Sequence, residues 1–233
     1  MFRKLALFLL LALPLAAAAQ DYTPPVLWPG YLSQPALQQV LAPPKGTPKP
    51  TPGQPTAATL PFRRDPAITR RVEAGIVAGQ GGSATPAGAA LSQTFASQDV
   101  LVPWGEALTS FNLQLNTVAD ALTANWLVLY LAANEIAAPP TAAQVAGLRR
   151  QALRLCAAPS MAALLTTSTR RQEMADYLHL QAFLTNNTQS SAEQTHDAAA
   201  SAALAQQARA AALQNLGFDP TTVVLTAKGL VKK

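Results

Sequence analysis

The segment from Leu115 to Ile136 restricts the fold of this chain more than any other. Its apolar residues recur every three or four positions, which is the spacing of one face of an α-helix. In its second half the other faces are apolar too, through Leu127, Val128 and Leu131. A helix that is hydrophobic on all sides is usually buried. The sequence therefore predicts a central helix over residues 116–136, with Trp126 in the core and other helices around it.

Apolar residues at helical spacing continue on both sides of this segment, and each run has a recognisable start. The runs before the central helix begin at Asp65-Pro66, Thr85-Pro86 and Asp99. The three runs after it begin with the capping pairs Thr141/Gln144, Thr169/Gln172 and Ser190/Glu193. Gly217 should end the last helix, and the tail beyond it should lie extended against the bundle. No region alternates with period two, so the sequence predicts one all-α bundle of six or seven helices over residues 62–233.

Two other segments precede this domain. Residues 1–19, MFRKLALFLLLALPLAAAA, have a basic start, an apolar run and a small-residue end, which is typical of a secretory signal peptide cleaved after Ala19. Residues 20–61 carry eleven prolines, which predict an extended, largely disordered tether. The first half of the tether is apolar enough to pack on its own domain, which we favour, or to bind a partner. We expect a soluble periplasmic or secreted protein without a transmembrane segment.

Charge and cysteine content narrow the function classes. Loss of Arg3 and Lys4 with the signal peptide leaves 15 Lys and Arg against 12 Asp and Glu, a net charge of +3. No nucleic-acid-binding signature is present, so we expect no nucleic-acid partner. The mild positive charge is compatible with an envelope protein or an anionic envelope component as partner. The single cysteine, Cys156, lies on the apolar stripe of its helix, which indicates a buried and inert thiol.

The two histidines form the one pattern that suggests a metal site. Asp176-x-x-His179 and Glu193-x-x-His196 each place a carboxylate beside a histidine on one helix face. A polar connection near residues 186–190 would join two antiparallel helices and bring the pairs to a similar height. Two acid-x-x-His pairs are part of the ligand set of a dinuclear site in a helix bundle, with Asp120 and Glu135 as the further acids it needs.

Helical phase argues against this metal site. Asp176 and His179 share a face with Gln172, opposite Met174 and Leu178, which indicates that the pair points to water. Glu193 is also explained as a capping residue.

Other common chemistries lack their signatures. There is no Gly-x-Ser-x-Gly, and the sequence around Gly81-Gly82-Ser83 lacks the lysine of a phosphate loop. Arginine doublets are expected to form solvated surface rather than an anion-binding patch, because adjacent helical residues point about 100° apart. The doublets are Arg63-Arg64, Arg70-Arg71, Arg149-Arg150 and Arg170-Arg171. The sequence points to no catalytic residue and no cofactor.

Two stretches carry a resemblance to a known family. One is NTVADA at residues 116–121, which runs into Trp126, and the other is LGFD at residues 216–219, followed by Leu225-Thr226 and Gly229. A loop leading into residues 144–150 lies between them. Over roughly residues 62–230 the chain resembles a family of exported bacterial proteins catalogued as a domain of unknown function. The resemblance implies export and a helical domain, and it carries over no catalytic residue.

These observations favour an exported helical protein that acts as a binding or structural module in the bacterial cell envelope. The alternative is a small metal-binding protein or metal-dependent enzyme that uses Asp176, His179, Glu193 and His196.

Overall fold

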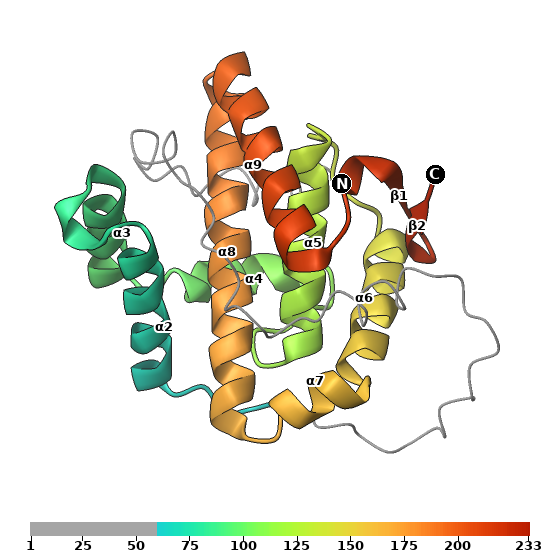
Figure 1. Ribbon diagram of the computed structural model, residues 1–233, viewed down its shortest axis with the longest axis horizontal. Helices are drawn as coiled ribbons and strands as arrows, with labels where there is room; N and C mark the ends of the chain where they lie inside the picture. Colours follow the sequence, from blue (N-terminus) through green and yellow to red (C-terminus); the bar gives the residue numbers. More distant parts are fainter. Residues whose placement is uncertain (1–59) are drawn as a thin grey trace.

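The computed structural model describes residues 60–233, apart from the side chains of Pro159, Ser160 and Asn215. The predicted signal peptide and nearly all of the predicted tether lie outside the described residues. The described part is predominantly helical, which confirms the all-α class (Figure 1). Its α-helices are α2 (Pro66–Gly79), α3 (Pro86–Ser97), α4 (Leu101–Thr109), α5 (Val118–Ala133), α6 (Ala142–Cys156), α7 (Pro159–Leu164), α8 (Ser168–Gln194) and α9 (Ala198–Leu216). Two 3₁₀ turns, η4 (Gly82–Ala84) and η5 (Pro220–Thr222), and a hairpin of β1 (Val223–Thr226) and β2 (Gly229–Lys232) complete it.

Helix α5 is the predicted central helix. Fifteen of its sixteen residues are buried, and α6, α8 and α9 pack around it. Thr117 caps its N-terminus by accepting a hydrogen bond from the backbone N–H of Asp120. Trp126 is 3% exposed, which confirms the prediction that it lies in the core.

Helix α8 is a second buried helix, and the sequence prediction divided it wrongly. The chain was expected to turn near residues 186–190 and to restart at Ser190/Glu193, but α8 continues for 27 residues to Gln194. The polar residues of this stretch have only a slightly lower helix propensity, and tertiary contacts override it. One such contact is the hydrogen bond from the Gln189 side chain to the carbonyl of Ile136, 3.1 Å. The chain turns at Thr195–His196 instead, and Asp197 caps α9.

Several predicted helix ends are confirmed. Asp65 caps α2, the Thr141/Gln144 capping box starts α6, and Gly217 ends α9 in the left-handed conformation, with φ of 67°. The Thr169/Gln172 pair is not a cap, because the N-cap of α8 is Thr167. Within the described residues there are eight α-helices rather than six or seven, the short α7 being the one that the sequence patterns missed.

The C-terminal tail is a β-hairpin that lies on α6. Gln151 of α6 is 3% exposed, and its side-chain amide accepts from the Leu230 N–H and donates to the Leu230 carbonyl, both at 2.7 Å. Gly147 allows the close approach, because a Cβ there would lie 2.5 Å from the carbonyl oxygen of Ala227. The predicted extended tail against the bundle is therefore present, as a two-stranded antiparallel sheet.

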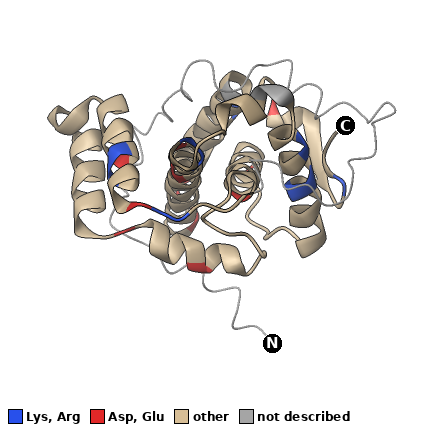
Figure 2. Cartoon of the chain, turned by 90° about the horizontal axis from the view of Figure 1, so that it is seen from below, with Lys and Arg blue, Asp and Glu red and all other residues tan. Residues whose placement is uncertain are grey.

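Helices α2 and α3, with η4 between them, form an arm at one side of the molecule. The arm packs on α8 through α2, while α3 packs mainly on α2 and η4 (Figure 1). Seen from below, the arm lies on one side of α8, and α6 with the hairpin lies on the opposite side beyond α5 (Figure 2). Among residues 60–233, no helix combines the length and the apolar character needed to span a bilayer.

Candidate functional site

The interface between α2 and α8 holds a cluster of buried polar side chains. Gln172 of α8 accepts from the backbone N–H of Asp65 and donates to the Asp65 carbonyl, both at 2.8 Å. Thr69 of α2 donates its hydroxyl to Asp176 of α8 at 2.7 Å, and the Gln172 amide donates to the same carboxylate oxygen at 3.0 Å. The N-terminus of α2 is therefore tied to α8 by paired polar contacts as well as by the apolar side chains around them.

Asp176 is the fully buried acid of this cluster. Burial raises the pKa of its carboxyl, and the hydrogen bonds from Thr69 and Gln172 and the charge of Arg64 act in the opposite direction. Arg64 Nε lies 3.7 Å from Asp176 Oδ1, an ion-pair distance, and neither atom has a hydrogen-bond partner within residues 60–233. The Arg64 guanidinium also lies 3.9 Å from Asp99. A single arginine is thus shared by two carboxylates.

Glu73 is the second acid at this interface, one turn further along α2. It is 8% exposed, and no described residue donates a hydrogen bond to its carboxylate. Burial raises its pKa from 4.5 to about 7, with further upward contributions from the charges of Asp99 and Asp176 and smaller lowering ones from Arg64 and Arg70. Glu73 therefore takes up a proton near neutral pH.

His179, one turn beyond Asp176, is completely buried. Its Nδ1 accepts a hydrogen bond from the indole N–H of Trp104 in α4 at 3.2 Å, so the proton of the neutral ring is on Nε2. Burial lowers its pKa to about 3, helped by the charge of Arg64 and opposed by the carbonyls of Gln114 and Leu115. Trp104 also meets Phe183 of α8 edge to face, with ring centroids 6.3 Å apart. His179 is a neutral link between α8 and α4.

The prediction that Asp176 and His179 point to water is therefore wrong. Both side chains have 0% exposure, because the polar face of α8 is covered by α2 and α4 rather than by solvent. The signal that the sequence did offer is the stretch from Leu178 to Leu184, which is apolar on nearly every side and typical of a buried helix.

The four candidate metal ligands do not meet in one place. Asp176 and Glu193 lie 17 residues apart on the unbroken helix α8, a rise of about 25 Å. Glu193 and His196 are exposed at the end where α8 turns into α9. Within residues 60–233, no group of three or more His, Cys, Asp or Glu side chains is close enough to hold a metal ion. The shared site depended on a hairpin near residues 186–190, and that hairpin is not there.

The two further acids proposed for that site are also far apart. Asp120 lies in the first turn of α5, fully buried, where Arg149 of α6 pairs with its carboxylate and the N–H of Gln114 donates to it at 3.1 Å. Glu135 is exposed just after the other end of α5, with φ of 52°. Asp120 thus links α5 to α6 and to the loop before α5.

Cys156 and the arginine doublets are likewise explained by packing. Burial raises the pKa of the Cys156 thiol to about 12, which confirms the predicted buried cysteine. The doublets were expected to be solvated surface. In three of the four doublets one arginine is exposed, as expected, and the other points into the protein. The inward members are Arg64 beside Asp176, Arg149 beside Asp120, and Arg171 on the carbonyl of Leu165. In the fourth doublet, Arg70 and Arg71 are both exposed, as expected.

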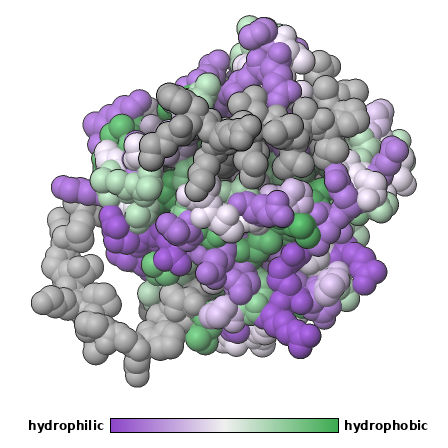
Figure 3. Space-filling view, turned by 180° about the vertical axis from the view of Figure 1, so that it is seen from behind, coloured by the Kyte–Doolittle hydropathy of each residue, from purple (hydrophilic) through white to green (hydrophobic). Residues whose placement is uncertain are grey.

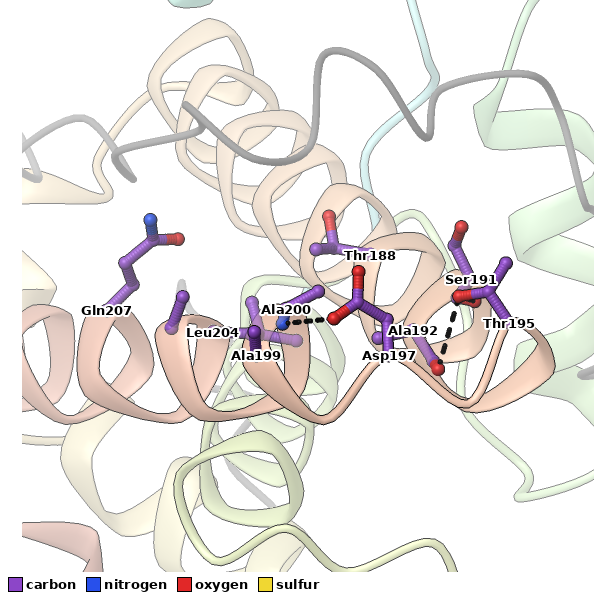
Figure 4. Close-up of a pocket in the computed structure, with 10 residues that line it drawn as sticks. Thr188, Ser191, Ala192, Thr195, Asp197, Ala199, Ala200, Leu204 and Gln207 are labelled. Atoms are coloured by element: carbon purple, nitrogen blue, oxygen red, sulfur yellow. Dashed lines mark hydrogen bonds between the residues drawn. The ribbon is translucent and has the colours of Figure 1, made fainter.

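A groove of about 370 Å³ lies between the end of α8 and the start of α9 (Figure 4). Hydroxyl and small side chains line it, among them Thr188, Ser191, Ala199 and Ala203. The one charged residue in its wall, Asp197, uses its carboxylate to accept from the N–H of Ala200 at 2.9 Å and so caps α9. Sequence patterns missed this groove, because it lies at the α8–α9 turn, which they placed near residues 186–190.

Four large hydrophobic side chains are exposed on the described surface. They come from four separate segments and are Leu60, Val102, Leu213 and Val224. On the face shown in Figure 3, the visible hydrophobic residues lie between hydrophilic ones.

Comparisons with known proteins find no relative whose site could be compared with this one. No family model matches the chain, and neither a curated protein nor a solved structure shows a significant match to it. The fold defines the class, an all-α bundle with an appended hairpin. The resemblance to an exported family of unknown function stays a prediction from the sequence.

Proposed function

We propose that this protein is an exported helical module of the bacterial cell envelope that works by binding a partner or by structural support rather than by catalysis. One observation carries the proposal: four described side chains of the types used in acid–base or nucleophilic chemistry are fully buried in the packing of the bundle. Asp176 and His179 join α8 to α2 and α4, Asp120 joins α5 to α6, and Cys156 is fully buried.

The groove between α8 and α9 is the surface that we would test first for a partner. Its wall is largely uncharged, and its one carboxylate is used as a helix cap, so it favours an envelope protein over an anionic lipid or polysaccharide. Small side chains along α9 leave room for a partner's side chains to enter.

Export is tested by sequencing the N-terminus of the protein recovered from the envelope fraction of bacteria that express it. We expect Gln20, or a residue within a few positions of it, as the first residue. Abundant cytoplasmic protein that retains Met1 would contradict export.

Binding is tested by pull-down of the full mature chain from envelope extract, with two neighbouring variants of α9. Ala203 lines the groove and Ala202 does not, and both are exposed. Ala203→Arg should abolish capture of a specific protein that wild type and Ala202→Arg both retain. Equal capture by the two variants would remove the groove from the proposal, and a catalytic turnover that tracks the purified protein would contradict the binding function.

A further inference from the structure

The α2–α3 arm meets the rest of the molecule in a way that allows it to move as a unit. Phe62, 4% exposed, precedes the arm and donates its N–H to the carbonyl of Asn116, and Val100, 0% exposed, follows it. Within the described residues, the arm between these two anchors contacts the bundle mainly where α2 lies on α8. Elements held through one interface open locally at a lower free energy than the core does.

Three carboxylates lie at or near this interface, and few cations face them. Glu73 of α2 and Asp176 of α8 are buried there, whereas Asp99, in the segment before α4, is half exposed. The cations that act on Glu73 are Arg64, already shared by Asp176 and Asp99, and Arg70 on its own helix, which is exposed. The other charged pair here is Arg71–Glu173 at the rim, and the ring of His179 further in is neutral.

We propose that the arm is a pH-dependent clasp, held closed on α8 while Glu73 carries a proton and loosened when Glu73 ionises. In the closed arm Glu73 is 8% exposed, no described residue donates a hydrogen bond to its carboxylate, and the charges of Asp99 and Asp176 oppose its ionisation. In an open arm the same carboxylate is hydrated and the repulsion is relieved. The neutral form of Glu73 therefore favours the closed state, and the ionised form favours the open one.

The size of the effect follows from linkage. The pKa of Glu73 is about 7 in the closed arm and near 4.5 when the side chain is in water. Each pKa unit of difference changes the closing equilibrium by a factor of about ten, so the constant should fall on the order of 100-fold between pH 4.5 and pH 7.

Hydrogen exchange of the full mature chain tests the clasp, because it reports opening of each helix separately. Protection factors, corrected for the intrinsic exchange rate at each pH, are measured at pH 5 and pH 8. Amides of α2 should lose at least about tenfold in protection at pH 8 relative to amides of α5 in the same sample. Wild-type α2 and α5 amides that keep a constant ratio would overturn the proposal.

Three variants separate the clasp from a merely weak interface. Glu73→Gln cannot ionise, so the pH dependence of its α2 protection should fall well below that of wild type, leaving at most the contribution of Asp176. Glu173→Gln, a carboxylate of the same interface that has an arginine partner, should keep the wild-type pH dependence. Thr69→Val removes a hydrogen bond to Asp176 and should lower protection at both pH values without abolishing the loss of protection from pH 5 to pH 8. Loss of the pH dependence in Glu173→Gln, or its survival in Glu73→Gln, would assign the effect to another group.

Discussion

At the scale of single residues, His179 was predicted to point to water and is instead completely buried. It fills space between α8 and α4 and accepts the only hydrogen bond that the Trp104 indole donates in the described structure. His179→Ala should lower the free energy of unfolding by about 2–4 kcal/mol, because it leaves a cavity and an unpaired indole N–H. Denaturant unfolding measures this, with His196→Ala as the exposed control, which should stay within about 0.5 kcal/mol of wild type. Equal effects of the two substitutions would show that the buried Trp104–His179 contact adds nothing to the free energy of unfolding.

Trp126 tests the core that the sequence predicted. It lies on α5 with 3% exposure, surrounded by the cluster of buried apolar side chains. Trp126→Ala should cost about 3–5 kcal/mol of stability, since a large side chain leaves a cavity that its neighbours fill only in part. Thermal unfolding checks the result, and a melting temperature within a degree or two of wild type would place Trp126 outside the core.

Burial of apolar residues was predictable from helical spacing, whereas burial of polar ones was not. Trp126 and Cys156 share stripes with apolar neighbours, so their own helices reveal where they lie. Asp176 is covered by Thr69, which is 107 positions earlier in the chain. Nothing local to α8 records that contact, so a polar face against another helix has the same pattern as a polar face in water.

At the scale of elements, helix starts were predicted better than helix lengths. A cap such as Thr141/Gln144 satisfies backbone groups within four residues, so it can be recognised locally. The continuation of α8 beyond residue 186 depends instead on packing against other elements, such as the contact from Gln189 to the Ile136 carbonyl. The position of the α8–α9 turn also decides where the groove lies.

The hairpin provides a prediction for one element. Gln151 makes both of its amide hydrogen bonds to the backbone of Leu230, so Gln151→Ala leaves a buried N–H and a buried C=O of β2 without these partners. We expect a loss of about 1–3 kcal/mol and faster proteolytic cleavage within residues 223–232. Arg154→Ala, an exposed position on the same helix, is the control and should cleave at the wild-type rate. Unchanged cleavage in Gln151→Ala would show that apolar contacts alone hold the hairpin.

At the scale of the whole molecule, three buried groups couple stability to pH, and His179 acts with the opposite sign to the other two. His179 has a pKa of about 3 when folded and 6.5 as its ordinary value, so the unfolded chain binds the extra proton between these values and stability rises with pH. Glu73 has a pKa of about 7 when folded and 4.5 as its ordinary value, so the folded protein binds the extra proton and stability falls as pH rises through this window. The raised pKa of Asp176 acts in the same direction as that of Glu73.

The contributions of Glu73 and His179 oppose each other between pH 4.5 and pH 6.5, and Glu73→Gln removes one of them. The stability difference between Glu73→Gln and wild type should therefore move in favour of the variant by about 2–3 kcal/mol from pH 4.5 to pH 7, since one pKa unit corresponds to about 1.4 kcal/mol. Urea unfolding at half-unit steps of pH measures both curves. In Glu73→Gln combined with His179→Ala, the rise that His179 produces below pH 6.5 should also disappear. Parallel curves for wild type and Glu73→Gln would mean that Glu73 titrates at its ordinary value. Glu73 would then be ionised in the closed arm at pH 5 to 8, and the clasp proposal would be wrong.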